Sequence, residues 1–206
     1  NSKRINKLIE TGLHLIDVSI DAYNNDTYKK IRVNGDLDIT RRNVLEFIKI
    51  ARSNNNKTKV VVSFVEQKEN SHEINEFHKF WTANGAHKVI IRKLHSNSGS
   101  LILENNNFKI KRFPCLYPWE RVVLNARGYL SFCPTDWYGK SEIEHYSKTT
   151  IKSLWKDNFY NDLRDQHLNN NFKNQFCKQC PDWKNTCWPQ SNKKERYNDV
   201  VDELLR

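Results

Sequence analysis

The chain has 206 residues and a formal net charge of +10, and 37% of its residues are hydrophobic. This length allows one large domain or two small ones. No run of residues approaches the roughly 20 apolar positions that span a bilayer, and no basic-then-apolar leader marks secretion, so we exclude a membrane-spanning protein and expect a cytoplasmic one.

The basic residues are spread along the whole chain among Asp and Glu residues. The densest basic stretches, residues 109–112 and 193–196, are short and carry no array of aromatic residues. This is the pattern of a solvated surface, and it argues against a nucleic-acid partner. The chain also contains no methionine, so we expect it to be a fragment or a processed product.

The first half of the chain alternates helix and strand patterns. Apolar residues at helical spacing predict helices, and short runs rich in β-branched residues predict strands. The expected helices cover residues 5–12, 40–54 and 70–84, and the expected strands cover residues 15–20, 59–65 and 88–93. Asn70 and Glu73 have the spacing of a capping box at the start of the third helix.

Strands that alternate with helices through short connections pair in parallel, by right-handed crossovers. Ligands of such sheets bind beyond the carboxyl ends of the strands. Polar residues follow each expected strand, and they favour either a ligand site or ordinary polar loops: Ser19, Asp21, Glu66, Gln67, Asn70, Arg92 and His95.

The second half of the chain has a different pattern. Residues 96–112 are rich in Ser, Asn and Gly and predict a linker. Beyond it, residues 121–132 predict a hairpin around positions 125–128, residues 150–168 predict an amphipathic helix, and residues 193–205 predict a final helix.

Four cysteines in this half have the spacing of a metal site. Cys115, Cys133, Cys177 and Cys180 read C-x17-C, then 43 other residues, then C-x2-C. These are the four thiolates of either one zinc ion or one [4Fe–4S] cluster. Zinc ribbons usually pair two C-x2-C knuckles, so the spacing favours the cluster and leaves zinc open. Cys187 is expected to be a free thiol, or else it replaces one of the four.

Several motifs together resemble a known family. They are residues 18–22 (Val-Ser-Ile-Asp-Ala) followed by 28–32 (Tyr-Lys-Lys-Ile-Arg), residues 89–92 (Val-Ile-Ile-Arg), the run Cys115-x12-Gly128-x4-Cys133, residues 151–155 (Ile-Lys-Ser-Leu-Trp) with Leu163 and Arg164, and the Cys177-x2-Cys180 pair. On these motifs the chain resembles the C-terminal part of a radical S-adenosylmethionine (radical SAM) enzyme with a SPASM or twitch auxiliary-cluster domain.

The resemblance implies an α/β chain in which residues 1–95 form the later half of a partial (β/α)6 barrel. Residues 96–112 would link it to a small α+β SPASM or twitch domain over 113–190, and residues 191–206 would form a C-terminal helix. It also implies that the four cysteines bind an auxiliary [4Fe–4S] cluster. The five cysteines of the chain are closer in number to a single-cluster twitch domain than to a full SPASM domain, which holds two clusters.

The resemblance also assigns residues to the S-adenosylmethionine site. Ser19 is expected near the ribose, with Asp21 and Arg32 orienting the loop. Arg32 could equally pair with a surface carboxylate. Asn70 and Arg92 stand where the family places polar groups that face S-adenosylmethionine or substrate, and structural capping explains them equally well.

One hallmark of the family is missing from the sequence, the C-x3-C-x2-C loop that binds the catalytic cluster. We therefore expect the chain alone to be inactive, and the intact enzyme to hold a second [4Fe–4S] cluster and S-adenosylmethionine. That enzyme would oxidise or modify a small-molecule or peptide substrate, such as a sugar-like alcohol, with an electron donor such as flavodoxin or ferredoxin. The alternatives are a zinc-stabilised module that binds an acidic partner or RNA, and a two-cluster SPASM peptide maturase.

Overall fold

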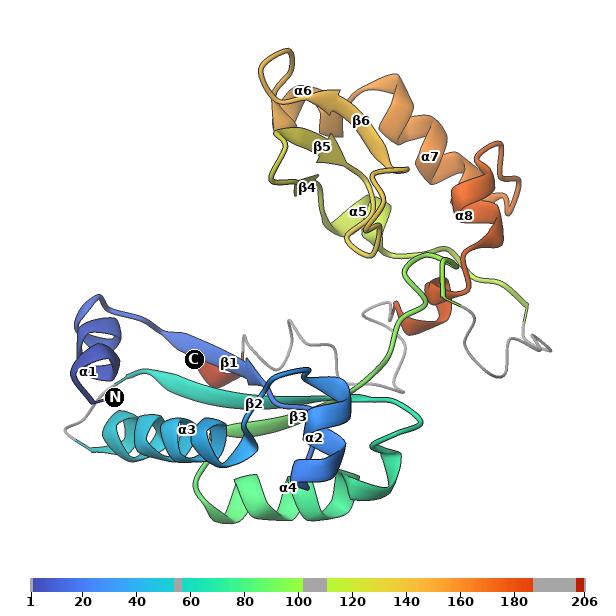
Figure 1. Cartoon of the computed structure of the whole chain (residues 1–206). Helices are drawn as coiled ribbons and strands as arrows, with labels where there is room; N and C mark the ends of the chain where they lie inside the picture. The colour runs from blue at the N-terminus through green and yellow to red at the C-terminus, as the bar shows by residue number, and fades with distance from the viewer. Residues whose placement is uncertain (1, 54–56, 102–110, 187–202, 206) are drawn as a thin grey trace. The chain divides into compact units, whose positions relative to one another are not determined.

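The computed structural model describes residues 2–53, 57–101, 111–186 and 203–205. The chain divides into two compact units, residues 1–94 with 195–206 and residues 95–194. Each unit has its own three-stranded sheet and its own hydrophobic core (Figure 1). The mixed α/β class predicted from the sequence is confirmed. Among the described helices, none has the length and apolar composition needed to cross a bilayer.

The first unit is built on a parallel sheet in the order β1-β2-β3. Its strands are β1 (Leu15–Ser19), β2 (Lys59–Glu66) and β3 (Lys88–Lys93). The register aligns Ser19 with Ser63 and Val65 with Arg92, so the carboxyl ends of the strands lie at one edge of the sheet. The predicted parallel pairing is therefore confirmed.

Two helices cover one face of this sheet (Figure 1). They are α3 (Leu37–Arg52) and α4 (Ile74–Ala83), and each presents an apolar stripe to the strands. Phe47 of α3 and Trp81 of α4 are buried in the same core as Val62 of β2. Removal of this apolar surface from water is the main stabilisation of the unit.

Two further α-helices of the first unit are α1 (Ser2–Glu10) and α2 (Asn25–Ile31). α1 ends just before Gly12, as predicted, and Gly12 takes the positive φ (+77°) that commonly ends a helix. α2 was not predicted. Its seven residues include only two large apolar side chains, Tyr28 and Ile31, so the sequence has no apolar periodicity long enough to mark a helix.

The predicted capping box at the start of α4 is wrong. The side chain of Asn70 makes no capping hydrogen bond, and its Oδ1 accepts the N–H of Gln67 at 2.6 Å. The carboxylate of Glu73 accepts the N–H of Tyr23 at 2.6 Å and the hydroxyl of Thr27 at 2.5 Å. Glu73 therefore joins a distant segment, and so does Asn70, whose Nδ2 donates to the Asp21 carbonyl oxygen at 2.8 Å. A 3-10 turn, Ser71–Glu73, leads into the helix.

The second unit contains an antiparallel sheet in the order β4-β5-β6 and several short helices. The strands are β4 (Val123–Leu124), β5 (Tyr129–Ser131) and β6 (Glu142–His145). The helices are α5 (Tyr117–Glu120), α6 (Ile151–Trp155), α7 (Asn158–Leu168) and α8 (Gln175–Gln179), followed by the 3-10 turn Asp182–Asn185. The core of this unit includes the side chain of Cys177.

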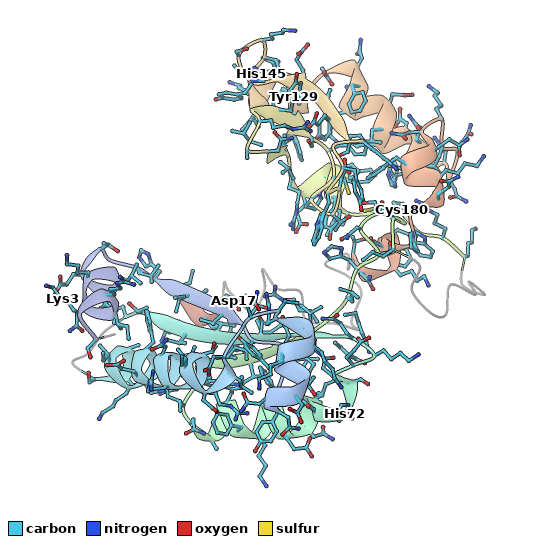
Figure 2. The ribbon with its side chains drawn as sticks, in the orientation of Figure 1. Lys3, Asp17, His72, Tyr129, His145 and Cys180 are labelled. Carbon is cyan, nitrogen blue, oxygen red and sulfur yellow. The ribbon has the colours of Figure 1, made fainter. Side chains whose placement is uncertain are left out.

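The predicted hairpin is confirmed as β4 and β5, and β6 extends it. Tyr129 of β5 pairs with His145 of β6, and their rings meet edge to face (Figure 2). Gly128 takes the positive φ (+84°) that the turn requires, and a Cβ at this position would clash with the ring of His145. Both the turn and the neighbouring strand therefore require glycine.

The single helix predicted over residues 150–168 is wrong, because the chain forms two helices there. α6 ends at Trp155, and Asp157 takes the extended backbone conformation of an N-cap. The carboxylate of Asp157 accepts the N–H of Tyr160 at 2.9 Å and so starts α7.

Residues 96–112 were predicted as a linker, but the first residues of this stretch are packed within the second unit. Residues 95–101 belong to the second unit, and Ser96, Asn97 and Ser98 are buried. Residues 102–110 lie outside the described residues. So does most of the C-terminal helix predicted over 191–206, of which residues 203–205 are described and are helical.

Candidate metal centre

All four cysteines of the predicted metal set line one pocket in the second unit. Cys115 precedes α5, Cys133 follows β5 and Cys177 lies in α8. Cys180 lies at the end of α8 (Figure 2). Each of the four is a free thiol. Aromatic side chains line much of the remaining wall: Tyr117, Phe132, Phe176 and Trp183. The fold therefore brings four sulfur donors from three separate segments to one largely apolar pocket.

Two of the cysteines share a local motif in which proline and then a polar residue follow. In Cys133-Pro134-Thr135, the Thr135 hydroxyl lies 3.2 Å from the Cys133 sulfur. In Cys180-Pro181-Asp182, the backbone N–H of Asp182 donates to the Cys180 sulfur at 3.4 Å. A residue two positions after each cysteine thus places a polar hydrogen beside its sulfur. Sequence reasoning missed both residues, although the repeated Cys-Pro pattern marks them.

A loop, residues 96–99, whose first three residues are buried, also reaches the site. Asn97, Ser98 and Gly99 take consecutive positive φ values of +50°, +58° and +90°. The carboxylate of Asp182 holds this loop, because it accepts the N–H of Ser96 at 2.7 Å and the N–H of Ser98 at 2.9 Å. The Ser98 hydroxyl then lies 3.3 Å from the Cys133 sulfur. Sequence reasoning missed this loop, since its composition is that of a linker.

The environment of the thiols opposes their ionisation. Burial raises the pKa of Cys115 to about 11 and the pKa of Cys180 to about 12. Burial also raises the pKa of Cys177, and the charges of the neighbouring cysteines, Cys133 first, add to that effect. Thiolates in such a pocket are stable only when a cation or a metal cluster lies among the sulfurs.

Two nitrogen-bearing side chains stand beside the thiols. The Nδ1 of His167 accepts the N–H of Cys115 at 3.3 Å, and burial followed by the nearby Arg112 lowers the pKa of His167 to about 4. His167 is therefore neutral near pH 7. Arg112 donates to the carbonyl oxygen of Cys177 at 2.7 Å and lies across the ring of Phe172. Neither side chain was predicted as part of the site.

The donor set fits an iron–sulfur cluster. Each iron of a [4Fe–4S] cluster takes one thiolate, so such a cluster uses four cysteine ligands. Four free thiols that share one pocket supply that ligand set.

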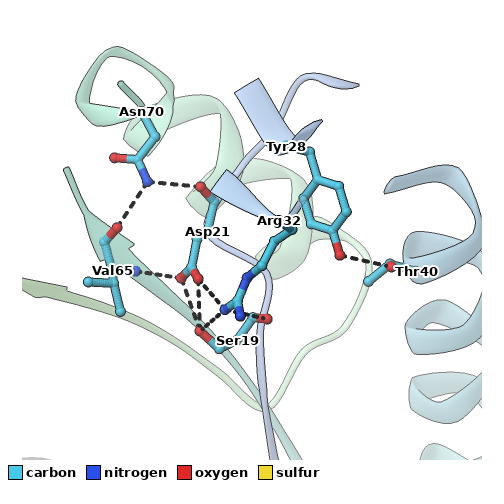
Figure 3. A network of polar contacts seen from close by, with 7 residues as sticks. All are labelled: Ser19, Asp21, Tyr28, Arg32, Thr40, Val65 and Asn70. Carbon is cyan, nitrogen blue, oxygen red and sulfur yellow. Dashed lines mark hydrogen bonds and ion pairs between the residues drawn. The ribbon is translucent and has the colours of Figure 1, made fainter. Parts of the chain in front are cut away.

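The polar residues predicted around S-adenosylmethionine lie in the first unit, and four of the five form one network (Figure 3). Ser19 donates to the carboxylate of Asp21 at 3.0 Å, and Arg32 forms an ion pair with the same carboxylate. Asp21 also accepts the N–H of Val65 at 2.7 Å, and Asn70 donates to the Asp21 carbonyl at 2.8 Å. The network ties the carboxyl end of β1 to that of β2.

The members of this network differ in exposure. Asp21 and Asn70 are 3% and 0% exposed, and their polar atoms are engaged within the protein. Ser19 and Arg32 are exposed at the edge of the sheet. The fifth predicted residue, Arg92, lies on β3 and pairs with Asp17 of β1, outside this network.

Residues 115–181 match the family model of SPASM, described as an iron–sulfur cluster-binding domain. The match contains all four cysteines and confirms the predicted SPASM-type domain. No curated protein sequence matches the chain. A solved structure titled "Crystal structure of SeMet BtrN in an OPEN conformation" is similar with a TM-score of 0.33 and 14% identity, over 82% of this chain and 92% of that one. Cys187 lies outside both the match and the described residues.

Proposed function

We propose that the chain binds one auxiliary [4Fe–4S] cluster through Cys115, Cys133, Cys177 and Cys180, as part of a radical SAM enzyme. The observation that carries the proposal is that all four cysteines line one pocket inside the segment that matches the SPASM family. The largely apolar wall fits the same role, because it would shield a bound cluster from solvent.

When bound, such a cluster supplies one-electron transfer or a site that anchors substrate. The residues of this chain hold and shield it. Ser98 and Thr135 place hydroxyls beside Cys133, and the N–H of Asp182 donates to Cys180. Hydrogen bonds to the sulfurs stabilise their negative charge and raise the reduction potential of a cluster. The aromatic wall, in which Phe132 and Trp183 are buried, would limit its contact with water.

In this proposal the first unit would bind S-adenosylmethionine. Its parallel sheet would be the later part of a partial (β/α)6 barrel, with S-adenosylmethionine beyond the carboxyl ends of the strands. The exposed Ser19 and Arg32 would contact S-adenosylmethionine, while the buried Asp21 and Asn70 would position the loop. Arg92 would have a structural part in this site, through its ion pair with Asp17 of β1.

The chemistry of the intact enzyme follows from the same proposal. We infer a cytoplasmic enzyme that oxidises or modifies a small-molecule or peptide substrate, with a sugar-like alcohol as one class, and that draws electrons from a flavodoxin or ferredoxin. Catalysis would need a second [4Fe–4S] cluster bound by a C-x3-C-x2-C loop. The 206-residue chain, which lacks that loop, would produce no 5′-deoxyadenosine.

Metal analysis of the chain after anaerobic purification and reconstitution tests the proposal. We expect a brown protein that absorbs near 400 nm and holds about four irons per chain. A colourless protein with about one zinc per chain would contradict the proposal and support the zinc-stabilised module. About eight irons per chain would instead support a two-cluster peptide maturase.

A further inference from the structure

One basic side chain borders the thiol pocket. Arg112 is the one lysine or arginine among the described residues that line it. Its guanidinium donates to the carbonyl oxygens of Cys177 and Lys178, at 2.7 Å and 3.0 Å. Its guanidinium carbon lies 4.0 Å from the centre of the Phe172 ring. These contacts hold the positive charge against the C-x2-C pair.

One nitrogen of this side chain has no hydrogen-bond acceptor in the part of the chain that the structure describes. This nitrogen, the Nε of Arg112, is buried. A buried N–H without an acceptor costs free energy, so an acceptor in the adjoining pocket would stabilise it. The side chain borders the pocket that holds the four thiols. The sulfur atoms of a cluster bound in this pocket could accept a hydrogen bond from the Arg112 Nε–H.

Arg121 offers a matched comparison in the same unit. It too is an arginine with a buried Nε that has no acceptor among the described residues, but it does not line the pocket.

We propose that the Nε–H of Arg112 donates a hydrogen bond to a sulfur of the auxiliary cluster, and that the positive charge of Arg112 stabilises the reduced cluster. The proposal rests on the proposed function, because it requires the cluster. The step is a one-electron reduction in which an external reductant such as dithionite loses the electron and the cluster gains one negative charge. A fixed positive charge beside the cluster therefore raises its reduction potential.

Redox titration of the cluster-loaded chain, followed by EPR, tests this role. Arg112→Gln is expected to lower the equilibrium constant for reduction about tenfold, equivalent to about 59 mV for one electron. Arg112→Lys keeps the charge and should lose less, and Arg121→Gln should leave the potential unchanged. An Arg112→Gln chain that holds the full cluster at the wild-type potential would overturn the proposal.

A second measurement uses the unaltered protein and covers the case in which Arg112→Gln fails to hold a cluster. In a chain labelled with ¹⁵N-arginine, pulsed EPR of the reduced cluster should detect coupling to arginine nitrogen. The coupling should persist in Arg121→Gln and vanish in Arg112→Lys. Absence of any arginine coupling in the loaded wild-type chain would overturn the role of Arg112. Failure of the wild-type chain to bind iron would instead overturn the proposed function.

Discussion

The carboxylate of Asp182 joins the 96–99 loop to the C-x2-C pair, and its removal has a calculable cost. It is 4% exposed and accepts two backbone N–H groups, from Ser96 at 2.7 Å and Ser98 at 2.9 Å. Hydrogen bonds to a charged acceptor contribute roughly 1.5–3 kcal/mol each, and buried donors left unpaired add a penalty. Asp182→Ala should therefore destabilise the second unit by about 3–5 kcal/mol.

Urea unfolding of the metal-free chain measures this loss, and Asp162→Ala is the matched control. The Asp162 side chain is 47% exposed and pairs with Lys173, so its removal should cost less than about 1 kcal/mol. Asp182→Asn keeps one acceptor oxygen and should fall between the two. A loss for Asp182→Ala no larger than that for Asp162→Ala would refute the reasoning.

Three further predictions concern other parts of the chain. Gly128→Ala should destabilise the second unit by about 2–3 kcal/mol in urea unfolding, because its φ is positive and its Cβ would meet a ring. Gly12→Ala, at a positive φ in open space, should cost about 1 kcal/mol, and equal losses would contradict this difference. Cys177→Ala should lose most of the bound iron, which metal analysis measures, and full iron retention would exclude Cys177 as a ligand. Burial and then nearby cations lower the pKa of His87 from its usual 6.5, so the folded state binds fewer protons than the unfolded state. The first unit should therefore lose stability as the pH falls below about 6.5, and a dependence that His87→Gln leaves unchanged would count against this cause.

Local signals in the sequence predicted a large part of the fold. The strand expected over 88–93 matches β3, because a β-branched run follows the Asn84-Gly85 helix end. The parallel order followed from alternation of strands and helices. The break at Asp157 was missed because apolar residues continue at helical spacing across it, so only the N-cap chemistry of Asp157 marks it.

The four cysteines were found from spacing alone, whereas most of their supporting residues were not. Ser98 and Arg112 reach the site through contacts across 35 and 65 residues of sequence, and no local pattern marks such contacts. Asn70 was misread because its neighbour Glu73 has capping-box spacing, while the fold uses both side chains for long-range contacts. These choices depend on tertiary packing and not on local propensity.

The ⁵⁷Fe Mössbauer spectrum of the reconstituted chain tests cluster binding by the four cysteines most directly. Cluster binding predicts the signal of one [4Fe–4S] cluster, at about four irons per chain, and its loss when Cys177 is replaced by alanine. A spectrum of unbound iron alone, from a chain that holds about one zinc, would contradict it.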